Sequence, residues 1–201
     1  MCGRYTFYTD QELREVDEII QKISDDINRE KMKTGEIFPT NLAPILLPSE
    51  QEPSRDNQVR LLTWGFPNFA GKGVVINARS ETAREKPMFR SSLAKRRCVI
   101  PSTGFFEWNR EKRKFLFRLP EDGMLYMAGL YNSFEGEDRF VILTTEANDS
   151  ISDVHDRMPV VLSRQEIRPW LSDPQAMEDI FVMPRPKLSR IDTEPVQLSL
   201  F

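Results

Sequence analysis

Apolar residues recur at helical spacing near the start of the chain and in short strand-like runs through most of the rest. Between residues 9 and 31 one apolar face repeats every three or four positions, which predicts a helix. The members of this face are Leu13, Val16, Ile19, Ile20, Ile23 and Ile27. Thr9-Asp10-Gln11-Glu12 fits a capping box at its start. The polar stretch 50–57, which contains Pro53, is predicted to be an exposed loop.

Short runs rich in β-branched, aromatic and other apolar residues predict a series of strands. They cover residues 43–47, 59–64, 73–76, 104–108, 115–119, 124–131 and 140–145. Asp122-Gly123 falls between two of these runs and predicts a hairpin. Helical patterns return at 91–95 and at 164–171, where Pro169 predicts a kink or an offset.

Strands outnumber helices and follow one another directly along the chain. This order predicts an α+β fold, a single strand-rich domain with mainly antiparallel, barrel-like sheets and flanking helices. We expect residues 2–193 to form this domain and residues 194–201 to form a C-terminal tail. A length of 201 residues suits one sizeable core, and we expect a monomer.

Composition narrows the class of protein. Hydrophobic residues make up 39% of the chain and charged residues 29%, which is typical of a soluble globular protein. No run approaches the roughly 18–20 apolar residues of a membrane span, and no secretory signal is visible, so we expect a cytoplasmic protein without a membrane partner. Cys2, Cys98 and His155 are too few for a structural zinc site, and we expect no metal and no cofactor.

Positive charge is concentrated in one span. Residues 79–118 contain 12 Lys and Arg residues and 4 Glu residues, a net charge of +8, whereas the whole chain has −3. Such asymmetry is compatible with a phosphate-binding face on an otherwise acidic protein. The alternative is a solvated surface with ordinary salt bridges.

Cys2 directly follows the initiator methionine. Bacterial methionine removal generally proceeds before a small residue, so we expect Cys2 to become the terminal residue. A terminal Cys carries a thiol with a reference pKa of about 8.5 beside an amine of about 7.7–8.0, and the neighbouring ammonium is expected to lower the thiol pKa. Such an aminothiol condenses with an aldehyde and closes a thiazolidine ring, or serves as an N-terminal nucleophile. The alternative is a small buried Cys that happens to be second.

Three polar residues stand among apolar ones at strand ends or in strands. Asn77 directly follows a predicted strand, and either caps it or belongs to a site. Glu107 lies between Phe106 and Trp108, so it either faces solvent or faces a cleft where desolvation raises its pKa and suits it to proton transfer. His155, flanked by two Asp residues, is either a structural residue or an acid/base.

Seven segments, in order along the chain, together resemble the SRAP family, the "SOS response-associated peptidases". They are Cys2-Gly3-Arg4-Tyr5, Trp64-Gly65, Asn77-Ala78-Arg79-Ser80-Glu81-Thr82, Arg97-Cys98-Val99-Ile100-Pro101, Gly104-Phe105-Phe106-Glu107-Trp108, Leu143-Thr144-Thr145 and His155-Asp156-Arg157-Met158-Pro159. Each segment alone is weak evidence, but seven in series are specific.

The resemblance implies a DNA-damage response protein that binds single-stranded DNA and crosslinks abasic sites to its N-terminal Cys. It implies active-site roles for Cys2, Asn77, Glu107 and His155. It implies contacts with the DNA backbone or positioning of the site by Arg4, Arg79 and Thr144. It implies less strongly phosphate contact by Arg84, and stacking or wedging at the lesion by Trp64 and Phe89, although Trp64 could instead be a core residue. An enzyme acting on DNA in this way is expected to be associated with the nucleoid.

Two other functions stay open. The family name suggests peptidase activity, including autocatalytic removal of Met1, with Cys2 as an N-terminal nucleophile. A non-covalent module for single-stranded DNA is the third possibility, in which the basic span dominates and Cys2 is incidental.

The last five residues resemble the Gln-Leu-x-Leu-Phe peptide that docks on the bacterial β sliding clamp. Leu200 and Phe201 would anchor in an apolar pocket, while Gln197 is hydrogen-bonded at its rim and Leu198 completes the motif. The alternative is a final strand that packs its own Leu and Phe into the domain.

Overall fold

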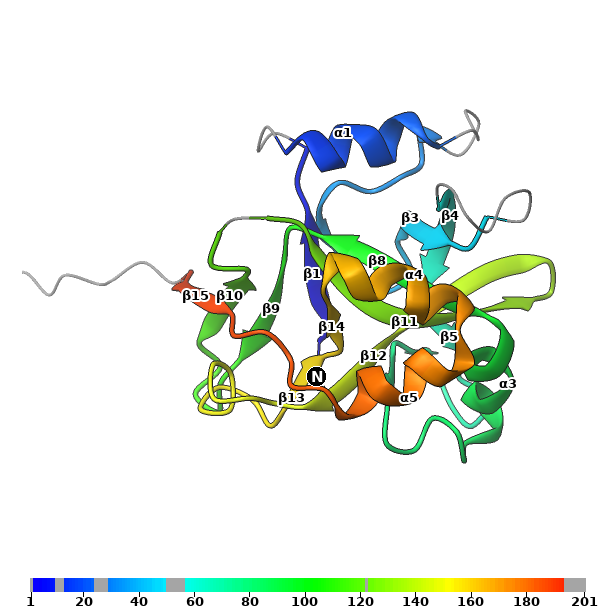
Figure 1. Ribbon diagram of the computed structural model, residues 1–201. Coiled ribbons are helices and arrows are strands. Elements are labelled where there is room, and N and C mark those ends of the chain that lie inside the picture. Colours follow the sequence, from blue (N-terminus) through cyan, green and yellow to red (C-terminus); the bar gives the residue numbers. More distant parts are fainter. Residues whose placement is uncertain (1, 10–12, 24–28, 50–56, 122, 194–201) are drawn as a thin grey trace, which may run out of the picture.

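Five strands close into a barrel because β12 pairs with β4 on one side and with β11 on the other. The computed structural model in Figure 1 describes residues 2–9, 13–23, 29–49, 57–121 and 123–193. Around the barrel the order is β12–β4–β3–β8–β11, with β12 and β4 parallel and the other pairs antiparallel. The five strands are β3 (Leu42–Leu47), β4 (Gln58–Trp64), β8 (Arg97–Ser102), β11 (Leu125–Phe134) and β12 (Glu137–Glu146).

Shorter strands extend the barrel near one end of β12. β7 (Asn77–Arg79) runs parallel to β12, with Asn77 opposite Ile142. β13 (Arg157–Pro159) also pairs with β12, and β14 (Val161–Leu162) pairs with β11. A separate two-stranded sheet is formed by β5 (Phe66–Pro67) and β6 (Val74–Val75). Because β7 and β13 both add to β12, the segments that carry Asn77 and His155 are brought to the same strand.

A second sheet stands beside the barrel, and all of its strand pairs are antiparallel. Its order is β15 (Ser189–Asp192), β10 (Lys114–Arg118), β9 (Gly104–Trp108), β1 (Arg4–Phe7) and β2 (Gly35–Ile37). The chain passes from β8 of the barrel to β9 of this sheet through one residue, Thr103.

The core lies between the barrel and the second sheet. Tyr5 of β1 meets Trp64 of β4 edge to face, with ring centroids 5.2 Å apart, and Trp64 stacks on Phe140 of β12 at 6.2 Å. The hydroxyls of Thr6 and Thr103 at the junction lie 2.8 Å apart and share a hydrogen bond, and both residues are buried. The two sheets therefore share one core.

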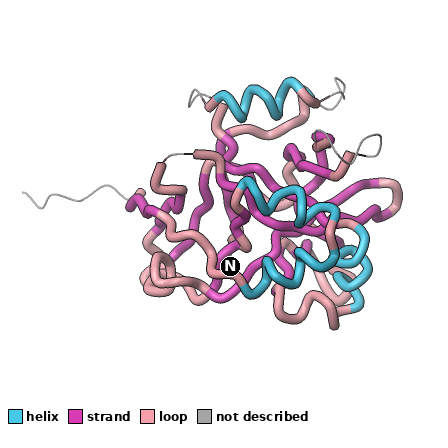
Figure 2. The backbone as a smooth tube through the Cα atoms, in the orientation of Figure 1, coloured by secondary structure: helices cyan, strands magenta, loops and turns pink. Residues whose placement is uncertain are grey.

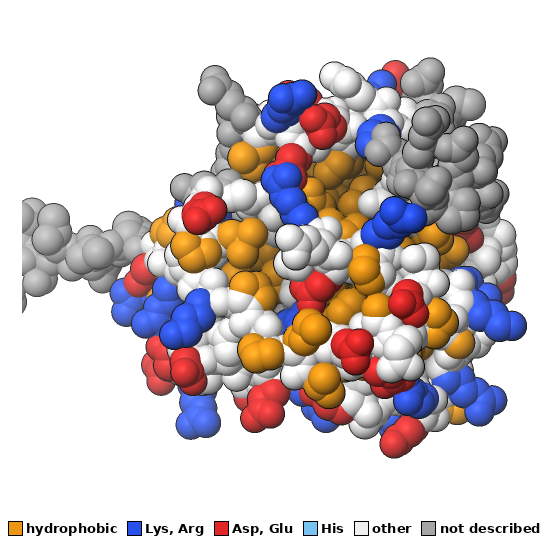
Figure 3. Space-filling view, in the orientation of Figure 1, with side chains coloured by type: hydrophobic (Ala, Val, Ile, Leu, Met, Phe, Trp, Pro, Cys, Tyr) orange, Lys and Arg blue, Asp and Glu red, His pale blue; other side chains and the backbone are white. Residues whose placement is uncertain are grey.

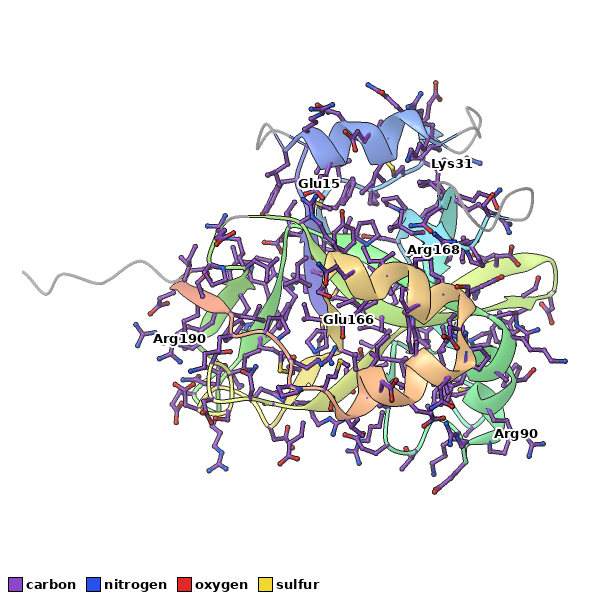
Figure 4. The ribbon with its side chains drawn as sticks, in the orientation of Figure 1. Glu15, Lys31, Arg90, Glu166, Arg168 and Arg190 are labelled. Atoms are coloured by element: carbon purple, nitrogen blue, oxygen red, sulfur yellow. The ribbon has the colours of Figure 1, made fainter. Side chains whose placement is uncertain are left out.

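The helices lie on the outside, as Figure 2 shows. They are α1 (Arg14–Gln21), α3 (Pro87–Lys95), α4 (Arg164–Ser172) and α5 (Pro174–Val182). α4 is tied to the barrel because the indole of Trp170 donates to the carbonyl oxygen of Cys98 at 2.8 Å. α1 is held by Glu15, which accepts a hydrogen bond from the Tyr126 hydroxyl at 2.9 Å and in Figure 4 lies on the inner side of the helix.

The predicted fold class is confirmed, and most predicted strands lie within two or three residues of observed ones. The hairpin predicted at Asp122-Gly123 is wrong: β10 pairs with β9 and β15, whereas β11 pairs with β8, β12 and β14. A turn signal indicates that the chain reverses, but it does not decide which strands pair.

The helix predicted over residues 9–31 is shorter than expected. α1 begins at Arg14 and ends at Gln21, with Val16 and Ile19 buried as the periodicity predicted. Leu13 is the N-cap and makes no side-chain capping bond. Residues 10–12 of the predicted capping box and residues 50–56 of the predicted loop lie outside the described residues.

Candidate active site

Cys2 is fully buried just before the start of β1, where the second sheet meets the barrel. The side-chain amide of Asn77 donates to the carbonyl oxygen of Cys2 at 3.0 Å, and the Cys2 thiol points to the carbonyl oxygen of Arg4 at 3.8 Å. Since Asn77 begins β7, this hydrogen bond ties the start of the chain to the barrel. The Asn77 Oδ1 atom is buried and accepts no hydrogen bond from the described residues.

Glu107 lies on β9 opposite Phe115 and is only 2% exposed. Burial raises the pKa of its carboxyl group to about 7, and the charge of Asp156 acts in the same direction. The positive charge of the amino terminus and the backbone N–H of Trp108 oppose this rise in pKa. Glu107 is therefore a carboxyl group that exchanges its proton near neutral pH, as proton transfer at this pH requires.

His155 precedes β13 and is partly buried. Its Nδ1 accepts the backbone N–H of Arg157 at 2.9 Å, so the neutral ring carries its proton on Nε2. Asp156 Oδ1 is also 2.9 Å from Nδ1, and it becomes a partner when that nitrogen is protonated. Burial, followed by the charge of the amino terminus, lowers the pKa of His155, which favours the neutral ring with an Nε2–H donor.

One charge connects these groups. The positive charge of the amino terminus acts to lower the pKa of Cys2, of Glu107 and of His155, although burial outweighs it for Cys2 and Glu107. All three side chains therefore lie around the start of the chain. For Cys2 the effect of burial is larger, and it raises the thiol pKa. The amino terminus acts in the expected direction on the thiol pKa but is outweighed by burial, and the expectation for a chain that begins with Cys2 stays a prediction because this chain carries Met1.

Arg157 was not among the predicted site residues, although it lies in the segment that contains His155. Its guanidinium makes two hydrogen bonds of 2.8 Å to Glu81 and one of 2.7 Å to the Thr144 carbonyl oxygen. These contacts join β12, β13 and the turn after β7, and the hydrogen bond from Arg157 lowers the pKa of Glu81. Arg157 was visible in the sequence only as one of many charges.

The predicted DNA-contact residues occupy different environments. Arg79 is exposed at the end of β7, opposite Thr144, whose side chain is buried. Arg84 is exposed and paired with Glu178 of α5. Arg4 is partly exposed, two residues from Cys2.

The stacking roles expected of Trp64 and Phe89 do not fit their burial. Trp64 is 0% exposed and its indole N–H donates to the Ile76 carbonyl oxygen at 3.1 Å, while Phe89 packs on Phe66. Both side chains fill the core and offer no open ring face. Among the described residues the exposed aromatic side chains are Phe38 and Phe69, at 41% and 77%, and no periodic pattern in the sequence singled out either.

The basic span 79–118 does not form one continuous face. Arg97 is 5% exposed and donates to the Trp170 and Leu93 carbonyl oxygens inside the protein. Arg90 points outward from α3 in Figure 4, whereas Lys112 follows β9 in the second sheet. The count of Lys and Arg residues in the span 79–118 therefore overstated how many of these cations lie together on one surface.

The most apolar groove shares no residue with this site. Apolar side chains are visible between α1 and α4 in Figure 3. A groove of about 520 Å³ is lined by Leu119, Tyr126, Leu162 and neighbouring residues from the segment before β11 and from the start of α4. Within the described residues no three His, Cys, Asp or Glu side chains form a group that could hold a metal ion. No helix in that part of the chain is long and apolar enough to cross a membrane. Gln197, Leu198, Leu200 and Phe201 lie outside the described residues.

Comparison with known proteins gives a consistent family. The family model described as SOS response associated peptidase (SRAP) matches residues 1–199. The abasic site processing protein YoqW of Bacillus subtilis is 34% identical over 201 residues, covering 90% of this chain and 86% of its own. The abasic site processing protein YedK of Escherichia coli is 34% identical over 185 residues, covering 85% and 79%. A crystal structure of a protein from Bordetella bronchiseptica has the same fold, with a TM-score of 0.75 at 23% identity, covering 96% and 100%.

The raised pKa of Glu107 predicts a stability cost at neutral and alkaline pH. The folded state holds a proton on Glu107 up to about pH 7, whereas the ordinary pKa of a Glu carboxyl group is 4.5, so stability from this group is present below pH 4.5 and is lost as pH rises through 7. Glu107→Gln removes the titration. Its free energy of unfolding relative to wild type should rise by about 3 kcal/mol between pH 4.5 and pH 8.

Urea denaturation at several pH values measures this difference. Glu111→Gln, which neutralises an exposed carboxylate after β9, is the matched control and should follow wild type at every pH. If Glu107→Gln and wild type differ by a constant amount across the range, Glu107 does not titrate as its burial indicates.

Proposed function

The chain belongs to the SOS response associated peptidase family, and we propose that it binds single-stranded DNA and crosslinks abasic sites to Cys2 once Met1 has been removed. The observation that carries this proposal is the convergence of Cys2, Asn77, Glu107 and His155 on the start of the chain. The printed names of relatives such as YoqW and YedK, abasic site processing proteins, support the same substrate.

The proposed reaction begins with the amine. Loss of Met1 converts the α-nitrogen of Cys2 from an amide into an amine, which attacks C1′ of the open-chain abasic aldehyde to give a carbinolamine. Burial favours the protonated thiol, so the amine is the first nucleophile. Asn77 Oδ1, which is buried and accepts nothing from the described residues, is suited to accept a hydrogen bond from this amine.

Proton transfers accompany each step. Before the amine attacks, the Nε2–H of His155 can protonate the sugar ring oxygen as the C1′–O4′ bond of the closed hemiacetal breaks, while the C1′ hydroxyl gives its proton to water and the aldehyde forms. Glu107, with a pKa of about 7, can protonate the carbinolamine hydroxyl so that water leaves and an imine forms. The thiol adds to the imine carbon while its proton passes to a base, and the thiazolidine holds new C1′–N and C1′–S bonds. This consumes the imine, the species from which strand-breaking β-elimination proceeds.

The crosslink should depend on both nucleophiles of Cys2. On single-stranded DNA with one abasic site, wild type should give a heat-stable covalent adduct and Cys2→Ser should not, because an oxygen cannot replace the thiol in the ring. Glu107→Gln should lower the rate of adduct formation by about 100-fold or more, the usual contribution of a positioned acid/base. The rate of adduct formation by wild type should change its dependence on pH near pH 7, where Glu107 titrates. Glu111→Gln should form the adduct at the wild-type rate.

Denaturing gels of timed reactions measure the adduct. An unchanged heat-stable adduct with Cys2→Ser would refute the crosslinking proposal. Equal, reversible binding to intact and abasic oligonucleotides by wild type would instead favour the non-covalent module.

Self-processing is the second candidate activity, and the electrostatic contact between Glu107 and the amino terminus favours it. In that reaction the Cys2 thiol attacks the Met1 carbonyl carbon, and Glu107 transfers the proton to the Cys2 nitrogen as the Met1–Cys2 amide bond breaks. Water then hydrolyses the resulting thioester, which releases methionine and restores the thiol. Intact-mass spectrometry should find Met1 absent from wild type and retained in Glu107→Gln, with Glu111→Gln processed as wild type. Complete loss of Met1 from Glu107→Gln would assign removal to a separate aminopeptidase.

The C-terminal peptide is proposed to bind a β sliding clamp through Gln197, Leu198, Leu200 and Phe201. Deletion of residues 197–201 should abolish retention on an immobilised bacterial clamp while leaving abasic crosslinking at the wild-type rate, because none of the residues proposed for crosslinking belongs to this peptide. Retention of the truncated protein on the clamp would contradict this role.

A further inference from the structure

A carboxylate lies between two cations on the outer face of the second sheet. Glu36 Oε2 is 2.9 Å from Arg4 Nη1, and Glu36 Oε1 is 2.9 Å from Lys114 Nζ. The three side chains come from β2, β1 and β10, and they are 30%, 28% and 23% exposed. Both carboxylate oxygens are used, one for each cation.

Aromatic rings hold the two cations in place. Lys114 Nζ lies 3.7 Å from the ring centroid of Phe106, and the Arg4 guanidinium carbon lies 4.3 Å from that of Phe38 and 5.2 Å from that of Trp108. The strand register explains why these side chains meet. Arg4 of β1 pairs with Phe106 of β9, and Lys114 of β10 pairs with Trp108 of β9. Each cation is thus fixed both by a ring and by the carboxylate. We call Arg4, Glu36, Phe38, Phe106, Trp108 and Lys114 the outer-face cluster.

The outer-face cluster has the composition of an anion site. Although partial burial alone would raise the pKa of Glu36, Lys114 and Arg4 lower it below its ordinary value, so the carboxylate is charged. Two positive charges and one negative charge leave a net charge of +1. Only Nη1 of Arg4 has a hydrogen-bond partner among the described contacts, so its Nε–H and Nη2–H groups are available to a phosphate, which guanidinium binds with two parallel hydrogen bonds.

We propose that the outer-face cluster is a phosphate subsite for the DNA strand beside the abasic sugar, and that Glu36 occupies the phosphate position in the free protein. On binding, a backbone phosphate displaces the carboxylate from Arg4 and Lys114. Arg4 begins β1 two residues after Cys2, so the subsite lies at the end of β1 where Cys2 is placed, on the sheet face opposite to Glu107 because Phe106 and Trp108 alternate with Glu107 along β9. The Arg4 guanidinium lies over one face of the Phe38 ring, and Phe38 is 41% exposed. Part of the Phe38 ring surface is therefore open to a neighbouring base of the DNA.

The displacement has a measurable consequence in salt. A phosphate neutralised by protein cations releases condensed counterions from DNA, which makes binding steeply salt-dependent. In wild type the freed Glu36 carboxylate takes up a cation from solution and offsets part of this release. Removing the carboxylate should therefore steepen the salt dependence as well as strengthen binding. The inference rests on the proposed function, because it requires the chain to bind single-stranded DNA.

The test uses the full-length protein and an intact single-stranded oligonucleotide, so that no covalent step contributes. Glu36→Gln should bind about fivefold more tightly than wild type at low salt, with a log K against log salt slope steeper by about 0.7, the single-strand value for one phosphate. Glu121→Gln, which makes the same charge change in the exposed loop after β10, should leave the slope unchanged. Adding Lys114→Met to Glu36→Gln should remove most of the gain. Matching thermal melts establish that the variants are folded.

Two results would overturn the inference. Equal affinity and slope for Glu36→Gln and Glu121→Gln would make the Glu36 contacts ordinary surface ion pairs. Weaker binding by Glu36→Gln would mean that the carboxylate stays in place and supports Arg4 rather than giving way to phosphate. In either case a wild-type protein that still crosslinks abasic DNA through Cys2 leaves the proposed function standing, whereas a protein that binds no single-stranded DNA refutes both.

Discussion

The site depends on the pairing of β1 between β2 and β9. This pairing sets Arg4 opposite Phe106, and therefore brings the residues before β1 beside the strand that carries Glu107. The hydrogen bond from Asn77 to the Cys2 carbonyl oxygen then attaches the start of the chain to the barrel. Residues near a chain terminus are usually the least ordered part of a domain, and here strand pairing of β1 and a side-chain amide hold Cys2 in place.

Burial at this junction has opposite effects on stability and on chemistry. The folded protein holds Glu107 where its charged form is disfavoured, which costs stability at neutral pH. The same desolvation moves its pKa to about 7, where a carboxyl group can both give and take a proton. The thiol of Cys2 is affected in the same direction, so the charged nucleophile is suppressed and the order of proposed steps follows.

Cations around the site are mostly paired rather than free. Arg4 contacts Glu36, Arg84 contacts Glu178, and Arg157 contacts Glu81. Such pairs fix the positions of guanidinium groups before any ligand is bound, and they reduce the attraction of an acidic protein for arbitrary anions. The surface can therefore be selective although the whole chain has a net charge of −3.

The sequence by itself determined the strand-rich α+β class and the burial of Val16 and Ile19, because local periodicity records them, whereas it pointed to Asn77, Glu107 and His155 only through the family resemblance. Only the tertiary structure decided that β10 and β11 belong to different sheets, that Trp64 is core, and that Glu36 lies between Arg4 and Lys114. The physical reason is separation along the chain: burial and charge pairing depend on which strands become neighbours. Glu36 and Lys114 are 78 residues apart in sequence, and no local pattern can report that they touch.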